Sequence, residues 1–424
     1  MLNNNLISKI SFGSVISIRG DLSLANNLLT SITFHSLKFI RGNLDLGNNQ
    51  LQWVRFRSLV LIRGNLSLLN NHLTSVTFSS HMFIGGYINL YNNQLTRIAF
   101  SSLSFLGGDI YLLNSPLKSV TFGGLPSVGG LVYMSNNHLT RVTFDSVTAV
   151  GGPVQLSSNK ITAIVFGSLA SIGGSLDLSY NKLARITFDS VTVIGGDLTV
   201  ASNELTQVTF NSLKSIGGYL DLGGNMIRNV IFGSLEFVGG DIHLGNNRLT
   251  SVSFGSLAVI PGFLDLAVNQ LTRIAFGSVV SIGGFLDVFA NKLATIDFGS
   301  VTFIGGHVSL WNNRLTQLAF GALTSIGGSL DLGTNQLTKL DFELLGILGG
   351  FLHVDHNLLT SVTFGSLTFI GADLFLNDNK LTNITFPATL SIASSIQVCN
   401  NPGAASLLTS CQVRYATCDS IITC

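Results

Sequence analysis

The chain has 424 residues, of which 10% are charged and 46% hydrophobic, and its formal net charge is +1. Neither a basic stripe, which nucleic-acid binding would require, nor a block of like charge, typical of an acidic tail, is present. No run of about 18 apolar residues occurs, so the sequence predicts no membrane-spanning helix. Most of the polar surface must therefore come from Ser, Thr, Asn and Gly.

A 22-residue period runs through the chain from residue 5 to residue 401. Its marker is an asparagine, called the ladder Asn below, which recurs as Asn5, Asn27, Asn49 and onward to Asn401 and is replaced only at Ser115. A fixed period of this kind is typical of a solenoid. We therefore expect one repeat body, although the length alone would suggest two or three domains.

Each repeat opens on a Leu-x-Leu segment, such as Leu22 and Leu24 ahead of Asn27, whose alternation predicts a short strand. A second short extended segment is expected after the Asn, ending on a Phe such as Phe34. Gly and β-branched residues in every repeat argue against a helix of ten or more residues. The sequence thus predicts a β-rich parallel solenoid of about 18 coils.

Two columns are expected to fill the interior. The position seven after the ladder Asn is Phe in every copy from Phe12 to Phe386, which predicts a continuous stack of rings. The ladder Asn should point inward and bond the backbone of its own and adjacent turns, because an unpaired buried amide is costly. We expect a local loosening at Ser115. Paired glycines such as Gly85-Gly86 should form tight corners without Cβ crowding.

The two ends differ from the repeats. The first ladder Asn comes four residues after Met1 with no capping segment, so we expect upstream residues or another molecule to cover that end. Residues 1–398 are predicted to form the solenoid and residues 399–424 a C-terminal cap. The cap would hold two disulfides, because all four cysteines fall there: Cys399, Cys411, Cys418 and Cys424.

The cysteines favour an oxidising compartment over a zinc site, since no Cys-x-x-Cys pair occurs. Two sequons, at Asn65 and Asn383, are glycosylation candidates, although so Asn- and Thr-rich a chain can produce them by chance. We therefore predict an extracellular or cell-surface protein, present here in a mature or partial form.

The pattern Leu-x-Leu-x-x-Asn-x-Leu resembles the leucine-rich repeat motif over residues 1–403. With the Ile-Gly-Gly-x-Leu-x-Leu and Phe-x-Ser-Leu-x-x-Ile segments it is also similar to the L domains of insulin- and growth-factor-type receptors and of fungal cell-wall glycoproteins. The resemblance implies a non-enzymatic protein that binds partners on its strand face. The cysteine segment resembles a leucine-rich C-terminal cap, although its spacing matches none closely.

The candidate binding residues lie six, four and two positions before the ladder Asn, where side chains should point outward. Aromatic residues stand there beside carboxylates and amides, a combination that suits sugar rings or a protein partner. The simpler alternative is that aromatic residues merely favour strands. The candidates are Tyr87, Tyr91, Tyr111, Tyr133, Phe263, Phe285, Asp287, Phe289, Trp311 and Phe351.

Metal and catalytic interpretations are weaker. Asp265 and Asp287 should lie about 5 Å apart on adjacent coils, but Ca²⁺ needs about six oxygen ligands and no further acids converge there. His353, Asp355 and His356 form a His/Asp cluster without a nucleophile on the same strand. We predict no enzyme activity, no cofactor and no metal.

The favoured hypothesis is an extracellular leucine-rich repeat protein that acts in adhesion, recognition or surface structure by binding a protein or glycan on its strand face. One alternative is a structural subunit that stacks end to end into a filament, suggested by the uncapped start. A further alternative is ice binding by Thr columns three and six after the ladder Asn, although residues such as Arg97 and Arg141 interrupt the neighbouring column.

Overall fold

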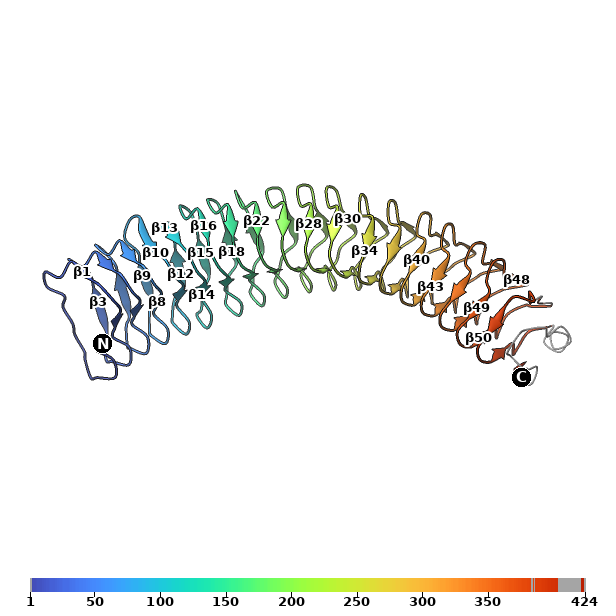
Figure 1. Ribbon diagram of the computed structural model, residues 1–424, viewed down its shortest axis with the longest axis horizontal. Coiled ribbons are helices and arrows are strands. Elements are labelled where there is room, and N and C mark those ends of the chain that lie inside the picture. Colours follow the sequence, from blue (N-terminus) through green and yellow to red (C-terminus); the bar gives the residue numbers. More distant parts are fainter. Residues whose placement is uncertain (1, 383, 385, 403–420, 423–424) are drawn as a thin grey trace. The chain divides into compact units, whose positions relative to one another are not determined.

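The computed structural model describes residues 2–382, 384, 386–402 and 421–422. It contains two compact units: unit 1 comprises Met1–Leu205 and Ser212–Ile216, and unit 2 comprises Thr206–Asn211 and Gly217–Cys424. Within each unit every repeat forms one turn of a parallel β-solenoid (Figure 1). The described residues form no helix and make about 17 turns, in agreement with the predicted parallel solenoid.

The Leu-x-Leu segments form the first sheet, whose strands pair in parallel with a 22-residue offset, so that Asp265 lies beside Asp287. In unit 1 its strands are β2 (Leu22–Ser23), β5 (Leu44–Asp45), β8 (Leu66–Ser67), β11 (Ile88–Asn89), β14 (Ile110–Tyr111), β17 (Val132–Tyr133), β20 (Val154–Gln155), β23 (Leu176–Asp177) and β26 (Leu198–Thr199). In unit 2 they are β29 (Leu220–Asp221), β32 (Ile242–His243), β35 (Leu264–Asp265), β38 (Leu286–Asp287), β41 (Val308–Ser309), β44 (Leu330–Asp331), β47 (Leu352–His353), β50 (Leu374–Phe375), β52 (Ile396–Gln397) and β53 (Ile421–Ile422).

The second extended segment of the repeat forms short parallel ladders, together called the second sheet. In unit 1 these strands are β3 (Ser31–Thr33), β6 (Trp53–Arg55), β9 (Ser75–Thr77), β12 (Arg97–Ala99), β15 (Ser119–Thr121), β18 (Arg141–Thr143), β21 (Ala163–Val165) and β24 (Arg185–Thr187). In unit 2 they are β27 (Gln207–Thr209), β30 (Asn229–Ile231), β33 (Ser251–Ser253), β36 (Arg273–Ala275), β39 (Thr295–Asp297), β42 (Gln317–Ala319), β45 (Lys339–Asp341) and β48 (Ser361–Thr363).

A third strand per turn, which the sequence did not reveal, forms the third sheet just before the glycine corner. In unit 1 it comprises β1 (Ser17–Ile18), β4 (Phe39–Ile40), β7 (Leu61–Ile62), β10 (Met82–Ile84), β13 (Leu103–Leu106), β16 (Ser127–Val128), β19 (Ala149–Val150), β22 (Ser171–Ile172), β25 (Val193–Ile194) and β28 (Ser215–Ile216). In unit 2 it comprises β31 (Phe237–Val238), β34 (Val259–Ile260), β37 (Ser281–Ile282), β40 (Phe303–Ile304), β43 (Ser325–Ile326), β46 (Ile347–Leu348), β49 (Phe369–Ile370) and β51 (Ser391–Ile392).

The predicted Phe stack is confirmed. In unit 1 neighbouring ring centroids along the column lie between 5.0 and 6.5 Å apart, as for Phe122–Phe144 and Phe144–Phe166. In unit 2 the ring of Phe298 lies 5.6 Å from Phe276 and 6.1 Å from Phe320, nearly parallel to both. These rings are buried together with the Leu, Ile and Val columns of all three sheets, and they form the apolar core of each turn.

The ladder Asn also behaves as predicted, and Asn49 is representative. Its Nδ2 donates to Leu46 O at 3.1 Å in its own turn and to Leu24 O at 3.0 Å in the preceding turn. Its Oδ1 accepts the Leu29 amide at 3.1 Å. Because these backbone groups are buried where no sheet pairs them, one amide side chain satisfies both turns.

The break in the ladder leaves polar atoms without partners. Among the described residues, Ser115 Oγ and Asn137 Oδ1 are the buried side-chain atoms that lack a hydrogen bond. The short Ser hydroxyl does not replace the Asn amide, and Pro116 beside it has no amide hydrogen to donate. At Ser115, where we expected a local loosening, the turn therefore stays buried but lacks hydrogen bonds.

At most corners a pair of glycines brings neighbouring turns closer than a side chain would permit, whereas Arg19, Arg41, Arg63 and Pro261 stand at the first position of four corners. A Cβ placed on Gly85 would lie 2.1 Å from the carbonyl oxygen of Arg63, and one on Gly283 would lie 2.0 Å from that of Pro261. Contacts this short do not occur for real Cβ atoms, so the corner confirms the predicted need for glycine.

The residue before each ladder Asn adopts a left-handed backbone, with φ between 50° and 58° in unit 1 and similar values in unit 2. Asn suits this conformation, and most copies in unit 1 carry it. Val268 does not: it is β-branched, 44% exposed, and has φ 55°. The strain there has no packing benefit to offset it.

Val268→Asn is therefore expected to stabilise unit 2 by about 1 kcal/mol, because Asn tolerates the left-handed region that a β-branched residue resists. Chemical denaturation of the full chain measures the change. Val280→Asn is the matched control, since Val280 is 42% exposed and is not among the positive-φ residues. Equal shifts for the two variants would show that polarity, rather than backbone strain, produces the effect.

Candidate functional site

The outward residues of the first sheet form three parallel columns, six, four and two positions before the ladder Asn. In unit 2 the middle column is rich in carboxylate and imidazole groups, and these side chains are half-buried. Its members are Asp221, His243, Asp265, Asp287, Ser309, Asp331, His353 and Phe375.

Middle-column aspartates have a structural role that the sequence interpretation missed. Asp287 Oδ1 accepts the amide of Phe289 at 2.9 Å, and Asp265 Oδ1 accepts that of Ala267 at 2.8 Å. The strand pairing ends after two residues, so this amide would otherwise lack a partner. One oxygen of each carboxylate therefore serves the fold, while the second is available for other contacts.

Aromatic rings line both sides of Asp287. In the column six before the Asn, Phe285 stacks on Phe263 with centroids 4.4 Å apart and on His307 at 4.8 Å. In the column two before the Asn, Phe289 stacks on Trp311 at 4.9 Å. We call these the two aromatic rows. Neither belongs to the core, and Trp311 is 37% exposed.

The surroundings of Asp287 change the pKa of its carboxyl. Burial raises the pKa of its carboxyl, and the neighbouring charge of Asp265 raises it further. The Phe289 amide, the Ser309 hydroxyl and His307 act in the opposite direction. The surroundings thus withdraw water from a carboxylate without supplying a lysine or arginine to balance its charge.

Two histidines in the middle column are paired with aspartates. His243 Nδ1 lies 2.9 Å from Asp265 Oδ2, and this hydrogen bond raises the pKa of the imidazole. His353 Nδ1 lies 2.9 Å from Asp331 Oδ1, and its Nε2 lies 3.4 Å from Asp355 Oδ2. The bonds to Asp331 and then Asp355 raise the pKa of His353 to about 9, although burial opposes the shift.

A raised folded-state pKa means that the His353 contacts stabilise the fold fully below the ordinary value of 6.5 and that this contribution is lost as the pH rises through about 9. We expect wild type to melt above His353→Gln at pH 6 and the difference to shrink towards pH 9.5. Thermal unfolding of both proteins across this range measures it. A gap that stays constant with pH would contradict the paired arrangement.

The remaining unit 2 candidate, Phe351, does not join the aromatic rows. Ser329 interrupts its column after His307, and Phe351 instead contacts Phe375 edge-on, with centroids 6.2 Å apart. The structure therefore groups Phe263, Phe285, Asp287, Phe289 and Trp311 and leaves Phe351 in a separate contact.

The tyrosine candidates of unit 1 form a second, more polar group. Tyr87 and Tyr111 pack edge-on with ring centroids 6.1 Å apart, and Tyr111 pairs in register with Tyr133. The Tyr111 hydroxyl donates to Asp109 Oδ2 at 2.8 Å, which raises the pKa of the phenol. The Tyr91 hydroxyl accepts from Asn114 Nδ2 at 2.9 Å. Tyr91 is the most exposed of the four.

The predicted His/Asp cluster does not meet at one point. His353 bonds Asp355, whereas His356 Nε2 lies 3.5 Å from Asp378 Oδ2. Within the described ranges, no group of three or more His, Cys, Asp or Glu residues has a metal-binding arrangement.

Only some of the predicted sequon and cysteine residues are among those that the structure describes. Asn65 lies half-buried ahead of β8, where its Oδ1 accepts the Tyr87 amide at 3.1 Å. Cys399 is buried two residues after the end of β52. Asn383, Cys411, Cys418 and Cys424 lie outside the described residues, so glycosylation, the disulfides and the cap at 399–424 stay predictions.

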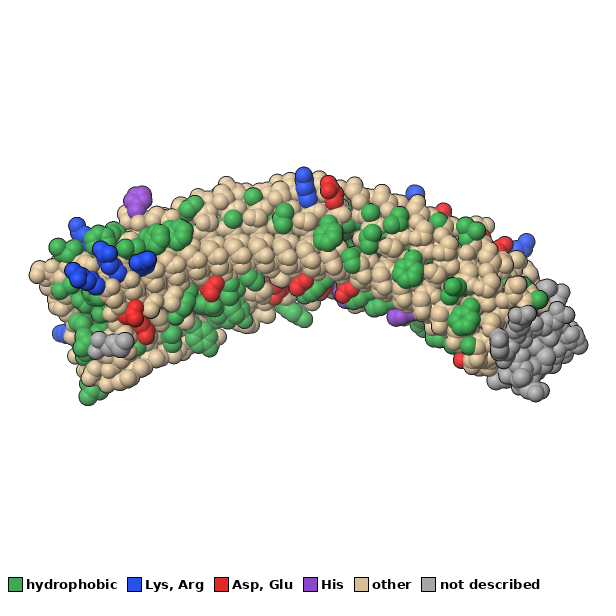
Figure 2. Space-filling view, viewed as in Figure 1, with side chains coloured by type: hydrophobic (Ala, Val, Ile, Leu, Met, Phe, Trp, Pro, Cys, Tyr) green, Lys and Arg blue, Asp and Glu red, His purple; other side chains and the backbone are tan. Residues whose placement is uncertain are grey.

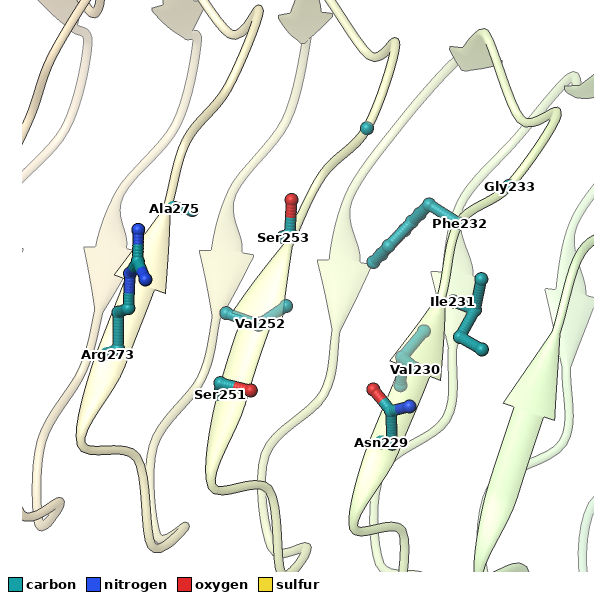
Figure 3. A pocket seen from close by; sticks show the side chains of 11 residues that line it. Asn229, Val230, Ile231, Phe232, Gly233, Ser251, Val252, Ser253, Arg273 and Ala275 are labelled. Atoms are coloured by element: carbon teal, nitrogen blue, oxygen red, sulfur yellow. The ribbon is translucent and has the colours of Figure 1, made fainter.

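Two outward surfaces were not anticipated. The third sheet exposes large apolar side chains, among them Phe237 at 51% and Phe303 at 44%. The second sheet of unit 2 carries an open pocket of about 600 Å³ on β30, β33 and β36, with Asn229, Ser251 and Arg273 at its edge (Figure 3). The face in Figure 2 is mostly uncharged, with few Lys, Arg, Asp or Glu side chains.

The Thr column three after the ladder Asn is engaged by the backbone. Thr272 Oγ1 donates to Thr250 O at 3.1 Å, and Thr162 Oγ1 donates to Thr140 O at 3.3 Å, each in the preceding turn. These hydroxyls link successive turns.

Comparison with known proteins identifies the repeat. Residues 312–402 match the BspA type leucine-rich repeat region in 6 copies, and no curated protein sequence gives a significant match. Similar solved structures include YopM from Yersinia enterocolitica WA-314, at 16% identity and TM-score 0.43 over 95% of this chain and 91% of that one. The leucine-rich effector YopM of Yersinia pestis gives 18% identity and TM-score 0.40 over 82% and 88%.

Toll, from the Drosophila Toll–Spätzle complex, gives 16% identity and TM-score 0.50 over 96% of this chain but 65% of that one. At this identity, the similarity to Toll shows a shared fold and nothing finer. The described residues contain no helix long and apolar enough to cross a membrane. The 22-residue turn, the Asn ladder and the matched repeats together show that the chain is a leucine-rich repeat protein.

Proposed function

We propose that the protein is an extracellular or cell-surface recognition scaffold that binds a protein or glycan on the first sheet of unit 2, without catalysis. The observation that carries the proposal is the pair of aromatic rows. These rings are not needed to fill the core. Because they are already stacked on a rigid sheet, they lose little conformational entropy when a ligand binds to them. Leucine-rich repeat proteins in general serve in binding, and Toll is solved in complex with Spätzle.

Photo-crosslinking tests the location of binding. A benzophenone amino acid replaces Phe285 in one full-length protein and Phe303, on the third sheet, in another. Both proteins are exposed to surface proteins of the source cells, and both are applied to a glycan array. Adducts at position 285 that disappear in Trp311→Ala support the proposal. Adducts at position 303 alone, or glycan binding unaffected by Trp311→Ala, would overturn it.

Ice binding by the Thr columns stays a hypothesis, which thermal hysteresis of the purified chain can test. End-to-end stacking stays a hypothesis, which light scattering of the purified full-length chain can test. A stable monomer at high concentration would exclude it.

A further inference from the structure

The charges of this chain are segregated between its sheets. Of 21 acidic residues, twelve stand in the three outward columns of the first sheet: Asp21, Asp45, Asp109, Asp177, Asp197, Asp221, Asp241, Asp265, Asp287, Asp331, Asp355 and Asp373. None of the 22 lysines and arginines stands in these columns in the described repeats. Basic residues occupy other positions, such as Arg273 and Lys339 on the second sheet. The formal net charge of +1 therefore conceals an acidic face.

Much of this acidity in unit 2 is already balanced. His243 pairs with Asp265, and His353 pairs with Asp331 and Asp355. Asp287 is not paired with a histidine: its described partners are the Phe289 amide and the Ser309 hydroxyl, which are neutral donors like the Gly223 amide that bonds Asp221. Among its described contacts the carboxylate has no histidine partner, although the charge of His307 lowers its pKa.

Asp287 also lies between the two aromatic rows. Outward side chains on one strand stand about 6.6 Å apart, so Phe285 and Phe289 flank the carboxylate on either side. Aromatic faces attract cations, and a planar guanidinium can stack on a ring while donating paired hydrogen bonds to a carboxylate. An ammonium group cannot form both contacts with the same geometry.

We propose that the first sheet of unit 2 binds a basic protein segment and that an arginine of this segment sits at Asp287 between the two aromatic rows. This inference rests on the proposed function and names its partner class. Charge complementarity selects the occupant: a face with carboxylates, aromatic rings and no lysine or arginine favours a basic segment over an acidic or neutral one. A glycan is the competing occupant that the experiment below can reveal.

The test uses the immobilised full-length protein and three soluble peptides, (Arg-Ser)5, (Lys-Ser)5 and (Gln-Ser)5, at about 150 mM salt, where exposed charges are screened beyond about 8 Å. Asp287→Asn is the informative variant, because an Asn Oδ1 can still accept the Phe289 amide and preserve the turn. Asp297→Asn is the matched control: Asp297 is an exposed acid on β39 that accepts the Gly299 amide at 2.8 Å in the same way.

We expect (Arg-Ser)5 to bind more tightly than (Lys-Ser)5, and (Gln-Ser)5 not to bind. Asp287→Asn should weaken (Arg-Ser)5 about tenfold, as expected for loss of a charged hydrogen-bond partner, while Asp297→Asn leaves it unchanged. Phe289→Leu should reduce the preference for Arg over Lys, an effect that a purely structural role would not produce.

Three results would overturn the inference: no binding of (Arg-Ser)5, equal losses in Asp287→Asn and Asp297→Asn, or binding of a neutral glycan at this face that the Arg peptide does not displace. If crosslinking at position 285 still succeeds, the proposed recognition function stands and only the basic partner is wrong. If crosslinking at position 285 also fails, the face itself is wrong.

Discussion

Phe298→Ala should destabilise unit 2 by about 3–5 kcal/mol, because it removes a fully buried ring and leaves a cavity that the fixed turns cannot close. The ring stacks on Phe276 and Phe320, so each of these neighbours also loses a contact face. Chemical denaturation followed by far-ultraviolet circular dichroism measures the loss.

The control for this change lies in the same repeat. Phe303 begins β40 of the third sheet and is 44% exposed, so Phe303→Ala removes a ring of equal size from the surface. We expect it to cost less than about 1 kcal/mol. If the two variants lose the same stability, the Phe column does not form the core of the turn.

Asn291→Ala should cost roughly 2–6 kcal/mol, although it removes few atoms. The Asn291 Nδ2 donates to Leu266 O at 3.0 Å and to Val288 O at 3.1 Å, and its Oδ1 accepts the Leu271 amide at 2.9 Å. Deleting the side chain leaves the buried Leu271 amide unpaired, which costs about 1–3 kcal/mol. It also removes one of two hydrogen bonds to each of Leu266 O and Val288 O, which still accept from Asn269 and Asn313, and each lost bond costs about 0.5–1.5 kcal/mol. Thermal and chemical unfolding measure the effect.

Ser115, which replaces the ladder Asn in one turn, allows the reverse change, in which the missing Asn is added. Ser115→Asn should raise the stability of unit 1 by about 1 kcal/mol, because a side-chain amide would replace a buried hydroxyl that has no partner. A loss for Asn291→Ala without any gain for Ser115→Asn would indicate that Pro116, rather than the missing amide, sets the local geometry. No loss for Asn291→Ala would contradict the ladder itself.

The sequence was sufficient to predict the interior, because the interior repeats. Phe298 and Asn291 recur at a fixed spacing, because an inward position requires the same residue in turn after turn. The third sheet was missed because strands such as β40 are two residues long, which is too short for alternation to be visible. Phe303 beside Ile304 gave no period-two signal.

The sequence predicted which residues of the candidate site lie on the same face, but it did not predict the hydrogen bonds between them. The outward columns follow from strand alternation, which placed Phe285, Asp287 and Phe289 together on one strand. The hydrogen bond from the Phe289 amide to Asp287 depends on where pairing ends, which the sequence does not state. A small residue two positions after an Asp, as in Asp265 and Ala267, was a partial signal for these bonds, but it would not have found the bond from Phe289 to Asp287.

The central claim is that the first sheet of unit 2 is the recognition surface. It is tested most directly by the affinity of the full-length protein for the ligand that crosslinks at position 285, using two matched double variants. Phe285→Ala/Trp311→Ala should weaken binding at least about tenfold, since buried aromatic anchors each contribute on the order of 1–2 kcal/mol or more. Phe237→Ala/Phe303→Ala, which removes exposed rings from the third sheet, should leave the affinity unchanged. Equal affinity in both variants, or a loss confined to the third-sheet pair, would contradict the account.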